Sequence, residues 1–287
     1  MLGFVNVYKP RGVTSFKVVG QLKKIYGEKR VGHLGTLDPM AEGVLPVAIG
    51  KATKFFDYFL KKDKEYIGDF IAGYETDSLD ADGEIVNENG FVPSIEDVQK
   101  SCQNFIGKVQ QTPPKFSAIK INGQRAYKLA REGKEFEIKP KEVEIYGLTA
   151  ERGLGDNLYR FKVWCSAGTY IRSLGSDVLK GAGALATMVK LVRTRSGPFK
   201  IDDARRIDEI EKDPQRFLIR VSDVLSSIKR IDLTEEEFFK IKNGVVFATD
   251  EKDSDYLAYY RDRIVGLTEV EDGKLRCKIN LIEEIYE

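Results

Sequence analysis

The sequence predicts an α+β protein with two domains. Its 287 residues are enough for roughly two domains of ~150 residues each, with a sizeable core. Segments with strand-like alternation and segments with helical periodicity follow one another without the regular strand–helix–strand repetition of a doubly wound sheet. A short, strand-rich and acidic segment at the end of the chain then predicts a second, small β-domain.

The first elements are a strand at residues 3–9 and a helix behind it, for which Thr14 or Ser15 is the cap. The expected apolar face of this helix consists of Phe16, Val19, Leu22 and Ile25. Alternation from Lys64 to Tyr74 predicts the next long strand. These three segments place a strand, a helix and a strand in the first quarter of the chain.

The middle of the chain continues the mixture. Ser94 begins a capping box and predicts a helix that ends at Gly107. Alternating apolar residues predict a strand at 159–165, and helices are expected at 171–181 and 203–211. The order of these elements is irregular, as in other α+β proteins.

Two segments differ from the rest in composition. Residues 108–142 contain a Pro-Pro pair and hold nine basic against four acidic residues, which predicts an insertion outside the core. Residues 231–287 hold 15 acidic and 8 basic residues, whereas residues 1–230 hold 30 and 38. This asymmetry favours a polyanionic partner for the basic part, although a solvated charged surface explains it equally well. A capping box at Thr234 supports a boundary near residue 230.

Composition excludes several classes. No apolar run approaches the ~20 residues that span a bilayer, and the N-terminus lacks the pattern of a signal peptide, so a cytoplasmic location is expected. Cys102, Cys165 and Cys277 are far apart, and His33 is the sole histidine. A disulfide framework and a structural zinc site are therefore not expected. A metal site made only of carboxylates is left open.

Three known motifs of catalysis or ligand binding are incomplete in this sequence. Leu45 and Ala52 stand where a phosphate-binding loop needs Gly and Ser or Thr. Ser78 and Asn89 stand where a calcium loop needs Asp and Glu, so this segment is expected to be a turn. A serine hydrolase triad would have to use His33, and the sequence has no G-x-S-x-G elbow.

Residues 32–54, GHLGTLDPMAEGVLPVAIGKATK, carry the most specific pattern. Within it, the tripeptide around Asp38 is by itself typical of a turn, because the residue before proline is pushed to extended geometry. The whole string resembles the TruB family of tRNA pseudouridine synthases. Their pattern is G-H-x-G-x-L-D-P-x-A-x-G-x-L-P followed by G-x-A-T-K, and every fixed position of it is present.

Further matches follow in order along the chain. They are Asn6–Pro10, Lys64–Tyr66, Asp80–Gly83, Gln111–Gly133 (with gaps), Gly168–Arg172 and Leu191–Phe199. The resemblance covers about residues 3–200 and continues more weakly into the tail, which is similar to a small PUA-type RNA-binding domain. It implies a mixed, largely antiparallel sheet with flanking helices in residues 1–230, an RNA-gripping insertion at about 108–142, and a PUA-like domain at 231–287.

The resemblance also implies an activity. The expected reaction is isomerisation of uridine 55 in the T-loop of tRNA to pseudouridine, by a monomer without cofactor, metal, guide RNA or obligatory protein partner. This reaction breaks the N1–C1′ bond and joins C5 to C1′, much as in glycoside cleavage. A target base inside a folded loop must first be extruded from it.

Four residues are implied in the reaction itself. Asp38 would attack C1′ or take the 2′ proton, and the sequence does not choose between these routes. Arg172 would keep that carboxylate ionised and oriented, and would otherwise be a structural ion pair. Tyr66 would stack on the flipped base and remove the C5 proton. Leu191 would pack against the base, although a leucine in a strand is usually a core residue.

The resemblance further implies contacts with the RNA. His33 would stack in the space that the flipped base leaves, as aromatic and histidine rings do with splayed bases. Lys9 and Lys54 would contact phosphates. The remaining candidates are Tyr170 and Arg193 in the catalytic domain and Lys120 and Arg131 in the insertion. Without the resemblance, the lysines would be ordinary surface residues and the insertion a mobile charged loop.

Three competing functions remain. The first is a guide-RNA-dependent enzyme of the same family, which the insertion and the lack of long basic tails disfavour. The second is an RNA-binding or chaperone protein without catalysis, which Asp38, Tyr66 and Arg172 disfavour. The third is a nucleoside hydrolase that releases free uracil.

Overall fold

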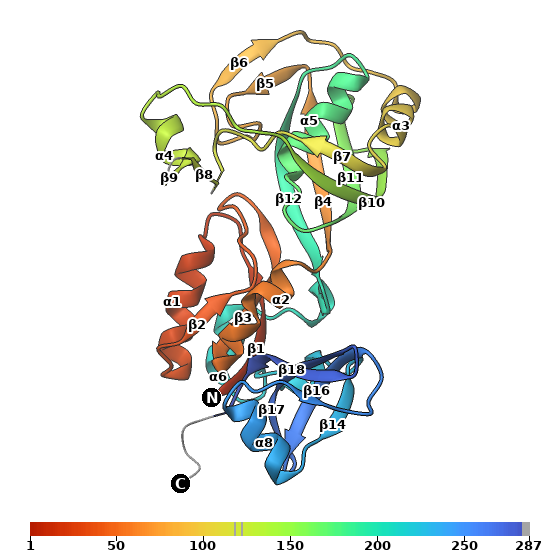
Figure 1. The fold of residues 1–287 in the computed structure, drawn as a ribbon. Helices are drawn as coiled ribbons and strands as arrows, with labels where there is room; N and C mark the ends of the chain where they lie inside the picture. Colours follow the sequence, from red (N-terminus) through yellow and green to blue (C-terminus); the bar gives the residue numbers. More distant parts are fainter. Residues whose placement is uncertain (118, 122, 283–287) are drawn as a thin grey trace.

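The computed structural model describes residues 1–282 except 118 and 122, so Ala118 of the predicted insertion lies outside the described residues. Within them, the chain forms a nine-stranded main sheet, a five-stranded C-terminal sheet and two small two-stranded sheets (Figure 1). Every strand pair assigned in the main sheet is antiparallel except that of β3 with β12. The predicted α+β fold with a mixed, largely antiparallel sheet is confirmed.

The main sheet has two parts. The N-terminal part contains β1 (Leu2–Lys9), β2 (Val31–His33) and β3 (Glu42–Gly50). The central part contains, in order across the sheet, β12 (Ala186–Ser196), β4 (Lys64–Ala72), β11 (Leu158–Cys165), β10 (Lys141–Arg152) and β7 (Gly107–Gln111), with β13 (Phe199–Lys200) beside β12. The two parts meet where β3 runs parallel to β12, through the pairs Val192–Glu42 and Arg193–Gly43. We call this meeting line the seam.

Helix α1 (Ser15–Tyr26) covers the N-terminal part, and its cap is the Thr14 side chain, which accepts a hydrogen bond from the Lys17 amide. The buried stripe of α1 includes Val18 and Leu22. Phe16 is 80% exposed, so its expected place in the core is wrong. The reason is geometric, because at 3.6 residues per turn Phe16 points roughly 100° away from the middle of that stripe.

Helix α5 (Ile171–Gly181) begins and ends as predicted and packs against β4 and β12. Gly175 allows this close approach, since a Cβ there would lie 2.1 Å from the Phe70 ring. Helix α6 (Ile207–Lys212) begins later than expected, because Arg205 is extended and hydrogen-bonds to β1. The other helices outside residues 108–142 are η1 (Lys51–Phe55), α2 (Phe56–Leu60), α3 (Ile95–Gln103), η2 (Ile201–Asp203), α7 (Val221–Val224) and α8 (Glu235–Lys242).

The predicted insertion leaves the main sheet between the end of β7 and the start of β10. It contains β8 (Lys120–Ile121), β9 (Gln124–Arg125) and α4 (Ala126–Arg131), which project to one side of the central part (Figure 1). A hairpin of β5 (Tyr74–Thr76) and β6 (Ile85–Glu88) continues from β4. The turn of this hairpin, at Ser78, and the insertion, at Phe116, both accept hydrogen bonds from Arg172 in the first turn of α5.

The C-terminal sheet contains β14 (Lys229–Asp232), β16 (Ser254–Tyr260), β17 (Arg263–Glu271), β18 (Lys274–Asn280) and β15 (Phe247–Ala248). It lies beside β1 and η1 (Figure 1), and its Leu257 and Leu267 belong to one apolar cluster with Phe4 and Phe55. The expected β-rich C-terminal unit is thus present. The predicted domain boundary after residue 230 stays a prediction. β14, the first strand of the C-terminal sheet, begins at Lys229. None of the described helices is long and apolar enough to cross a membrane.

Candidate active site

Asp38 lies in the loop between β2 and β3, at one end of the N-terminal part of the sheet. Its Oδ2 atom is 2.9 Å from Nη2 of Arg172, which comes from the first turn of α5 in the central part. The Asp38 side chain is 41% exposed, whereas that of Arg172 is 5% exposed. The carboxylate is therefore open to a substrate while its partner is enclosed.

The Arg172 guanidinium is fixed by groups from two other segments. Its Nη1 atom lies 3.0 Å from Oδ2 of Asp80 and donates to the Ser78 carbonyl at 2.9 Å. Its Nη2 atom donates to the Phe116 carbonyl at 3.0 Å as well as pairing with Asp38. The Asp80 carboxylate in turn accepts a hydrogen bond from the Ser78 hydroxyl at 2.6 Å. Sequence reasoning had treated this segment as a turn and had assigned no role to Asp80.

The loop that carries Asp38 is held by buried polar groups. The Ser15 hydroxyl donates to the Leu37 carbonyl and accepts from the Leu37 amide, both at 3.0 Å. The fully buried Lys9 ammonium donates to the carbonyls of Val13 at 2.7 Å and Pro39 at 3.3 Å. Burial lowers the pKa of Lys9 to about 8. A phosphate contact by Lys9 stays a prediction, and its contacts here are those of a support for the loop.

Tyr66 and Leu191 lie on neighbouring strands of the central part. Tyr66 of β4 is in register with Arg193 of β12, and Gly68 is in register with Leu191. A Cβ on Gly68 would meet three side chains at 3.1–3.7 Å, Leu191 among them, so the space above this glycine is already filled. Burial raises the pKa of the Tyr66 phenol, and the Arg193 guanidinium beside it acts in the opposite direction. The negative charge of Asp38 also raises the pKa of this phenol.

His33, at the end of β2, has an unusual environment. Its Nδ1 atom is buried and has no hydrogen-bond partner, and burial with the nearby Arg193 lowers the pKa of the imidazole. A ring whose pKa falls below its usual 6.5 is neutral at neutral pH. His33 also lines a hollow of about 340 Å³ together with Lys29 and Arg30. These features suit stacking on a base better than contact with a phosphate.

The other predicted RNA contacts are dispersed. Tyr170 precedes α5, and the Lys141 ammonium lies 4.8 Å from the centre of its ring. Lys54 donates to the Asn280 carbonyl of the C-terminal sheet at 2.6 Å, so its ammonium faces that sheet. Arg193 is 1% exposed and donates to backbone carbonyls of the N-terminal part. The RNA contacts assigned to these residues stay predictions.

The insertion presents basic side chains to solvent. Lys120 and Arg131 are exposed, and the Arg131 guanidinium lies 5.9 Å from the centre of the Tyr127 ring. A hollow of about 410 Å³ is lined by Lys120, Gly123, Gln124, Arg125, Lys128, Glu132 and Lys134. Its lining is mainly polar and basic, which is suited to a phosphate backbone.

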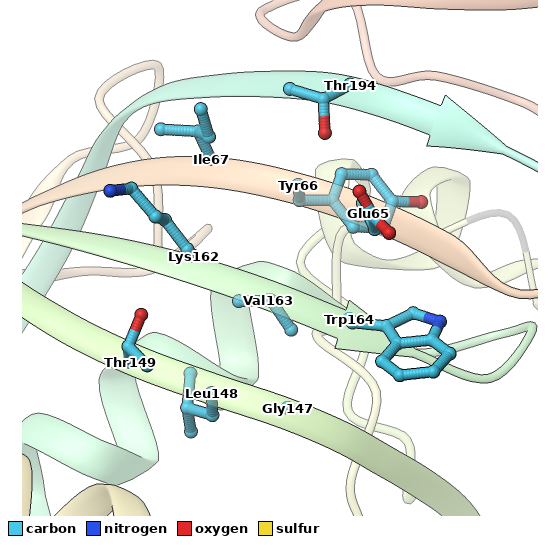
Figure 2. Close-up of a pocket in the computed structure, with 10 residues that line it drawn as sticks. All are labelled: Glu65, Tyr66, Ile67, Gly147, Leu148, Thr149, Lys162, Val163, Trp164 and Thr194. Carbon is cyan, nitrogen blue, oxygen red and sulfur yellow. The ribbon is translucent and has the colours of Figure 1, made fainter. Parts of the chain in front are cut away.

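A third hollow, of about 340 Å³, lies on the open face of the central part (Figure 2). Its lining includes Glu65, Tyr66 and Trp164. Since successive strand residues point to opposite faces, Glu65 and Tyr66 belong to different sides of β4. The Glu65 carboxylate pairs with Arg195 at 2.8 Å on the open face. Of the residues proposed to react, Tyr66 lines this hollow, whereas Asp38 and Arg172 are not among its lining residues.

The acidic side chains of the site are occupied by other partners. In the described part of the chain, no three His, Cys, Asp or Glu side chains are grouped so that they could hold a metal ion. The carboxylates nearest the site, Asp38 and Asp80, are both paired with the Arg172 guanidinium.

Comparison with known proteins decides the family. The family model described as TruB family pseudouridylate synthase (N terminal domain) matches residues 23–171. This chain belongs to the TruB family. The expected pseudouridine synthase is thus confirmed.

Several bacterial members of the TruB family resemble the chain over most of its length. The tRNA pseudouridine synthase B of Francisella philomiragia is 39% identical over 99% of this chain and 96% of the relative. The proteins of the same name from Clostridium tetani and Rickettsia akari are 41% and 40% identical, over 93% and 90% of this chain and 95% and 90% of the relatives.

Solved structures support the fold of this TruB family member. A chain of an H/ACA RNP bound to a substrate RNA containing 2′-deoxyuridine has a TM-score of 0.70 and 22% identity, covering 98% of this chain and 85% of that one. A chain of a Cbf5-Nop10-Gar1 complex has a TM-score of 0.67 and 25% identity, covering 93% and 78%. We take from them the fold, which includes the C-terminal sheet.

Proposed function

We propose that this chain converts uridine 55 in the T-loop of tRNA to pseudouridine, alone and without a cofactor. The observation that supports this most directly is the pair of Asp38 with Arg172 at 2.9 Å beside Tyr66, in a member of the TruB family. The relatives of about 40% identity bear the name tRNA pseudouridine synthase B, which supports tRNA as the substrate.

Asp38 is the catalytic carboxylate of this proposal. Once the base is flipped out, the carboxylate either attacks C1′ as the N1–C1′ bond breaks or removes the 2′ proton, and both routes release the uracil for rotation. Arg172 stabilises the negative charge of Asp38 and holds its orientation, because the guanidinium is itself fixed by Asp80 and two carbonyls. The new C5–C1′ bond then forms as C1′ leaves the Asp38 carboxylate, or as the proton returns to C2′; C5 loses its proton and N1 gains one.

Tyr66 and Leu191 hold the base during rotation in this proposal. They lie on adjacent strands, and Gly68, which pairs with Leu191 in register, is the second residue after Tyr66 and shares its face of β4. The neutral His33 ring fills the place of the base in the T-loop. In this proposal Tyr66 also removes the C5 proton, directly or through water, and the Arg193 guanidinium assists by lowering the pKa of the phenol against the effect of burial.

The RNA is held by two further regions in this proposal. The insertion grips the T-arm through its basic side chains, which line the hollow at Lys120 and Lys128. Residues 231–287 form the PUA-like domain, and residues 1–230 form the catalytic domain. The chain works as a monomer and needs neither a guide RNA nor a partner protein.

One experiment tests the proposal. Purified chain is incubated with an unmodified tRNA transcript in buffer with chelator, and pseudouridine is mapped by chemical labelling and primer extension. We expect a single product at position 55 and none in a transcript with cytidine at that position. Absence of product from the wild-type chain would refute the proposal.

The same assay separates the alternatives. Product formed only after guide RNA and accessory proteins are added would identify the guide-dependent branch of the family. Free uracil with an abasic site would identify a nucleoside hydrolase. Tight binding without any change of the base would identify an RNA-binding protein.

A further inference from the structure

Arg193 is among the largest fully buried side chains of the chain, with 1% exposure. Burying a guanidinium is costly unless its donors are satisfied. The reaction proposed above assigns no step to this residue, although it lies between Tyr66, Lys9 and His33, whose pKa values it influences. The contacts of its guanidinium must therefore compensate for this burial.

The guanidinium of Arg193 is bonded on three sides to the backbone of a different part of the sheet. Nε donates to the Val44 carbonyl at 2.8 Å, Nη2 to Gly35 at 3.1 Å and Nη1 to Thr36 at 3.2 Å. Arg193 belongs to β12 in the central part, whereas all three acceptors belong to β3 or to the β2–β3 loop. The last two lie close to Asp38 in that loop. The side chain thus crosses the seam and ends at the catalytic loop.

The seam has few other links between backbones. Its parallel ladder consists of the pairs Val192–Glu42 and Arg193–Gly43. Gly43 has a φ of +104°, and a Cβ there would lie 2.3 Å from the Arg193 carbonyl oxygen. The backbones therefore touch at this point, and the Arg193 side chain extends the contact along β3 and into the loop.

The candidate active site lies across the same seam. Asp38 comes from the N-terminal part, while Tyr66 and Arg172 come from the central part. Tyr66 pairs with Arg193 in register, and the Arg193 guanidinium lowers the pKa of its phenol. Arg193 is consequently bonded to the loop of Asp38 and paired with the strand residue that would face the base.

We propose that Arg193 is a positioning residue that fixes the Asp38 loop relative to Tyr66 and Arg172 across the seam. This proposal rests on the proposed function for the reaction whose geometry it controls. Lysine cannot replace Arg193, because one ammonium cannot reproduce a planar fork bonded to three carbonyls. Misplacement of a catalytic group by about 1 Å can cost on the order of 100-fold in rate.

Arg195 provides a matched control. It lies on the same strand, but the bulge between residues 193 and 195 turns it to the open face. There it pairs with Asp63 at 2.7 Å and Glu65 at 2.8 Å and makes no contact with the Asp38 loop. Arg195→Gln therefore removes a guanidinium of similar connectivity without touching the catalytic loop.

The first test compares Arg193→Lys and Arg193→Gln with Arg195→Gln, well below the Tm of each variant. In the Arg193 variants we expect kcat to fall by about 10- to 100-fold while KM and Kd for tRNA stay within about 3-fold. In Arg195→Gln we expect kcat to change by less than about 3-fold. Unchanged kcat with a raised Kd would overturn the proposal and assign Arg193 to RNA binding.

The second test needs neither RNA nor activity. Amide hydrogen exchange of residues 34–44 should become faster in Arg193→Lys and stay unchanged in Arg195→Gln. Faster exchange throughout the main sheet of Arg193→Lys would overturn the proposal in favour of a general structural role. If the wild-type chain forms no pseudouridine, the proposed function fails, and the exchange measurement still decides whether Arg193 fixes the loop.

Discussion

At the level of single residues, the candidate active site combines the accessible carboxylate of Asp38 with the enclosed guanidinium of Arg172. Asp38 is 41% exposed, so a ribose can reach its free oxygen, whereas Arg172 is 5% exposed and is held by four groups. An arginine fixed in this way loses no further side-chain freedom when substrate arrives. The orientation of the carboxylate is thus set before binding, which is the usual purpose of such supporting contacts.

Replacement of Asp38 by asparagine tests the first of these roles. Asp38→Asn keeps the size of the side chain and removes its ability to act as nucleophile or base. We expect turnover to fall by at least about 100- to 10,000-fold while Kd for tRNA stays within about 2-fold. Single-turnover assays and filter binding measure the two quantities. Asp57→Asn, an exposed acid on α2, is the control, and activity retained in Asp38→Asn would exclude Asp38 from the mechanism.

Lys9 predicts a dependence of stability on pH. Its pKa is about 8 in the folded chain because of burial, below the usual 10.5, so protonated Lys9 opposes folding below that pH. Between pH 8 and 10.5 the unfolded chain binds more protons than the native one, and this group makes stability rise with pH. Relative to Lys9→Met, the wild-type unfolding free energy should gain up to about 1.4 kcal/mol per pH unit in that window.

Urea unfolding of both proteins at a series of pH values from neutral to alkaline measures this difference. Subtracting the two profiles cancels the contributions of the other titrating groups. Parallel profiles would show that Lys9 titrates normally and that its ammonium is not enclosed in solution.

The sequence predicts candidate catalytic residues but not the groups that support them. Asp38, Tyr66 and Arg172 are predicted because the family pattern fixes their neighbours in the chain, and their roles stay predictions. The pairing of Asp80 with Arg172 and the enclosure of Arg193 depend on contacts between distant segments, which a single sequence does not show. Their roles become visible only when the strands are placed side by side.

At the level of elements, local signals predicted local structure. Helix α5 was predicted with its observed bounds because its apolar periodicity is undisturbed. Helix α6 begins at Ile207 rather than near residue 203, because a backbone hydrogen bond from Arg205 to Asn6 keeps the chain extended there. Tertiary pairing overrode helical propensity at that point, as it commonly does.

The seam predicts an effect of a single methyl group. In Gly43→Ala the new Cβ would lie 2.3 Å from the Arg193 carbonyl oxygen at a φ of +104°, so the two strands must separate. We expect a loss of roughly 1–3 kcal/mol or more in unfolding free energy. In Gly20→Ala, inside α1 with nothing within 4 Å, we expect a gain of about 0.5–1 kcal/mol.

Chemical denaturation of the two variants measures both changes. We also expect Gly43→Ala to lose activity at temperatures where it is folded. The reason is that Asp38 lies in the loop that leads into β3, and a displacement of β3 would move that loop. An active and stable Gly43→Ala protein would show that the seam tolerates a wider separation.

The insertion predicts a salt-dependent effect. Lys120→Gln combined with Lys128→Gln removes two exposed charges from its hollow. We expect weaker tRNA binding and a slope of log Kd against log salt concentration that is smaller by about 1.4–1.8. At saturating tRNA, kcat should be unchanged. The control is Lys100→Gln combined with Lys212→Gln on α3 and α6, and equal slopes in both variants would contradict a specific role of the insertion.

At the level of the whole molecule, the C-terminal sheet shares a core with the main sheet. Leu257 and Leu267 are paired on β16 and β17 and belong to the apolar cluster of Phe4 and Phe55. Hydrogen bonds from Lys51 to the Ile282 carbonyl and from Lys54 to Asn280 accompany it. The sequence predicted a separate small domain here from strand pattern and charge. Its shared core could not be predicted, because apolar residues do not show which neighbour they will cover.

The shared cluster predicts cooperative unfolding. Leu267 is fully buried, so Leu267→Ala should cost about 2–5 kcal/mol. Trp164, the sole tryptophan, lies on β11 of the central part and reports on the main sheet. We expect its fluorescence midpoint in urea to shift together with the far-ultraviolet signal. A Trp164 midpoint that stays in place would show that the C-terminal sheet unfolds on its own.

The seam also has a consequence for the order in which the ribosome makes this protein. The hydrogen bond from Arg193 to Val44 spans 149 positions of sequence, and its acceptor is synthesised first. A nascent chain that has just passed Arg172 already carries Asp38, Tyr66 and Arg172, yet it lacks β12, which supplies Leu191 and joins the two parts of the sheet. The chain thus holds these catalytic candidates before it can form the site. A chain that ends between Arg172 and Arg193 should therefore be inactive, although it contains Asp38, Tyr66 and Arg172.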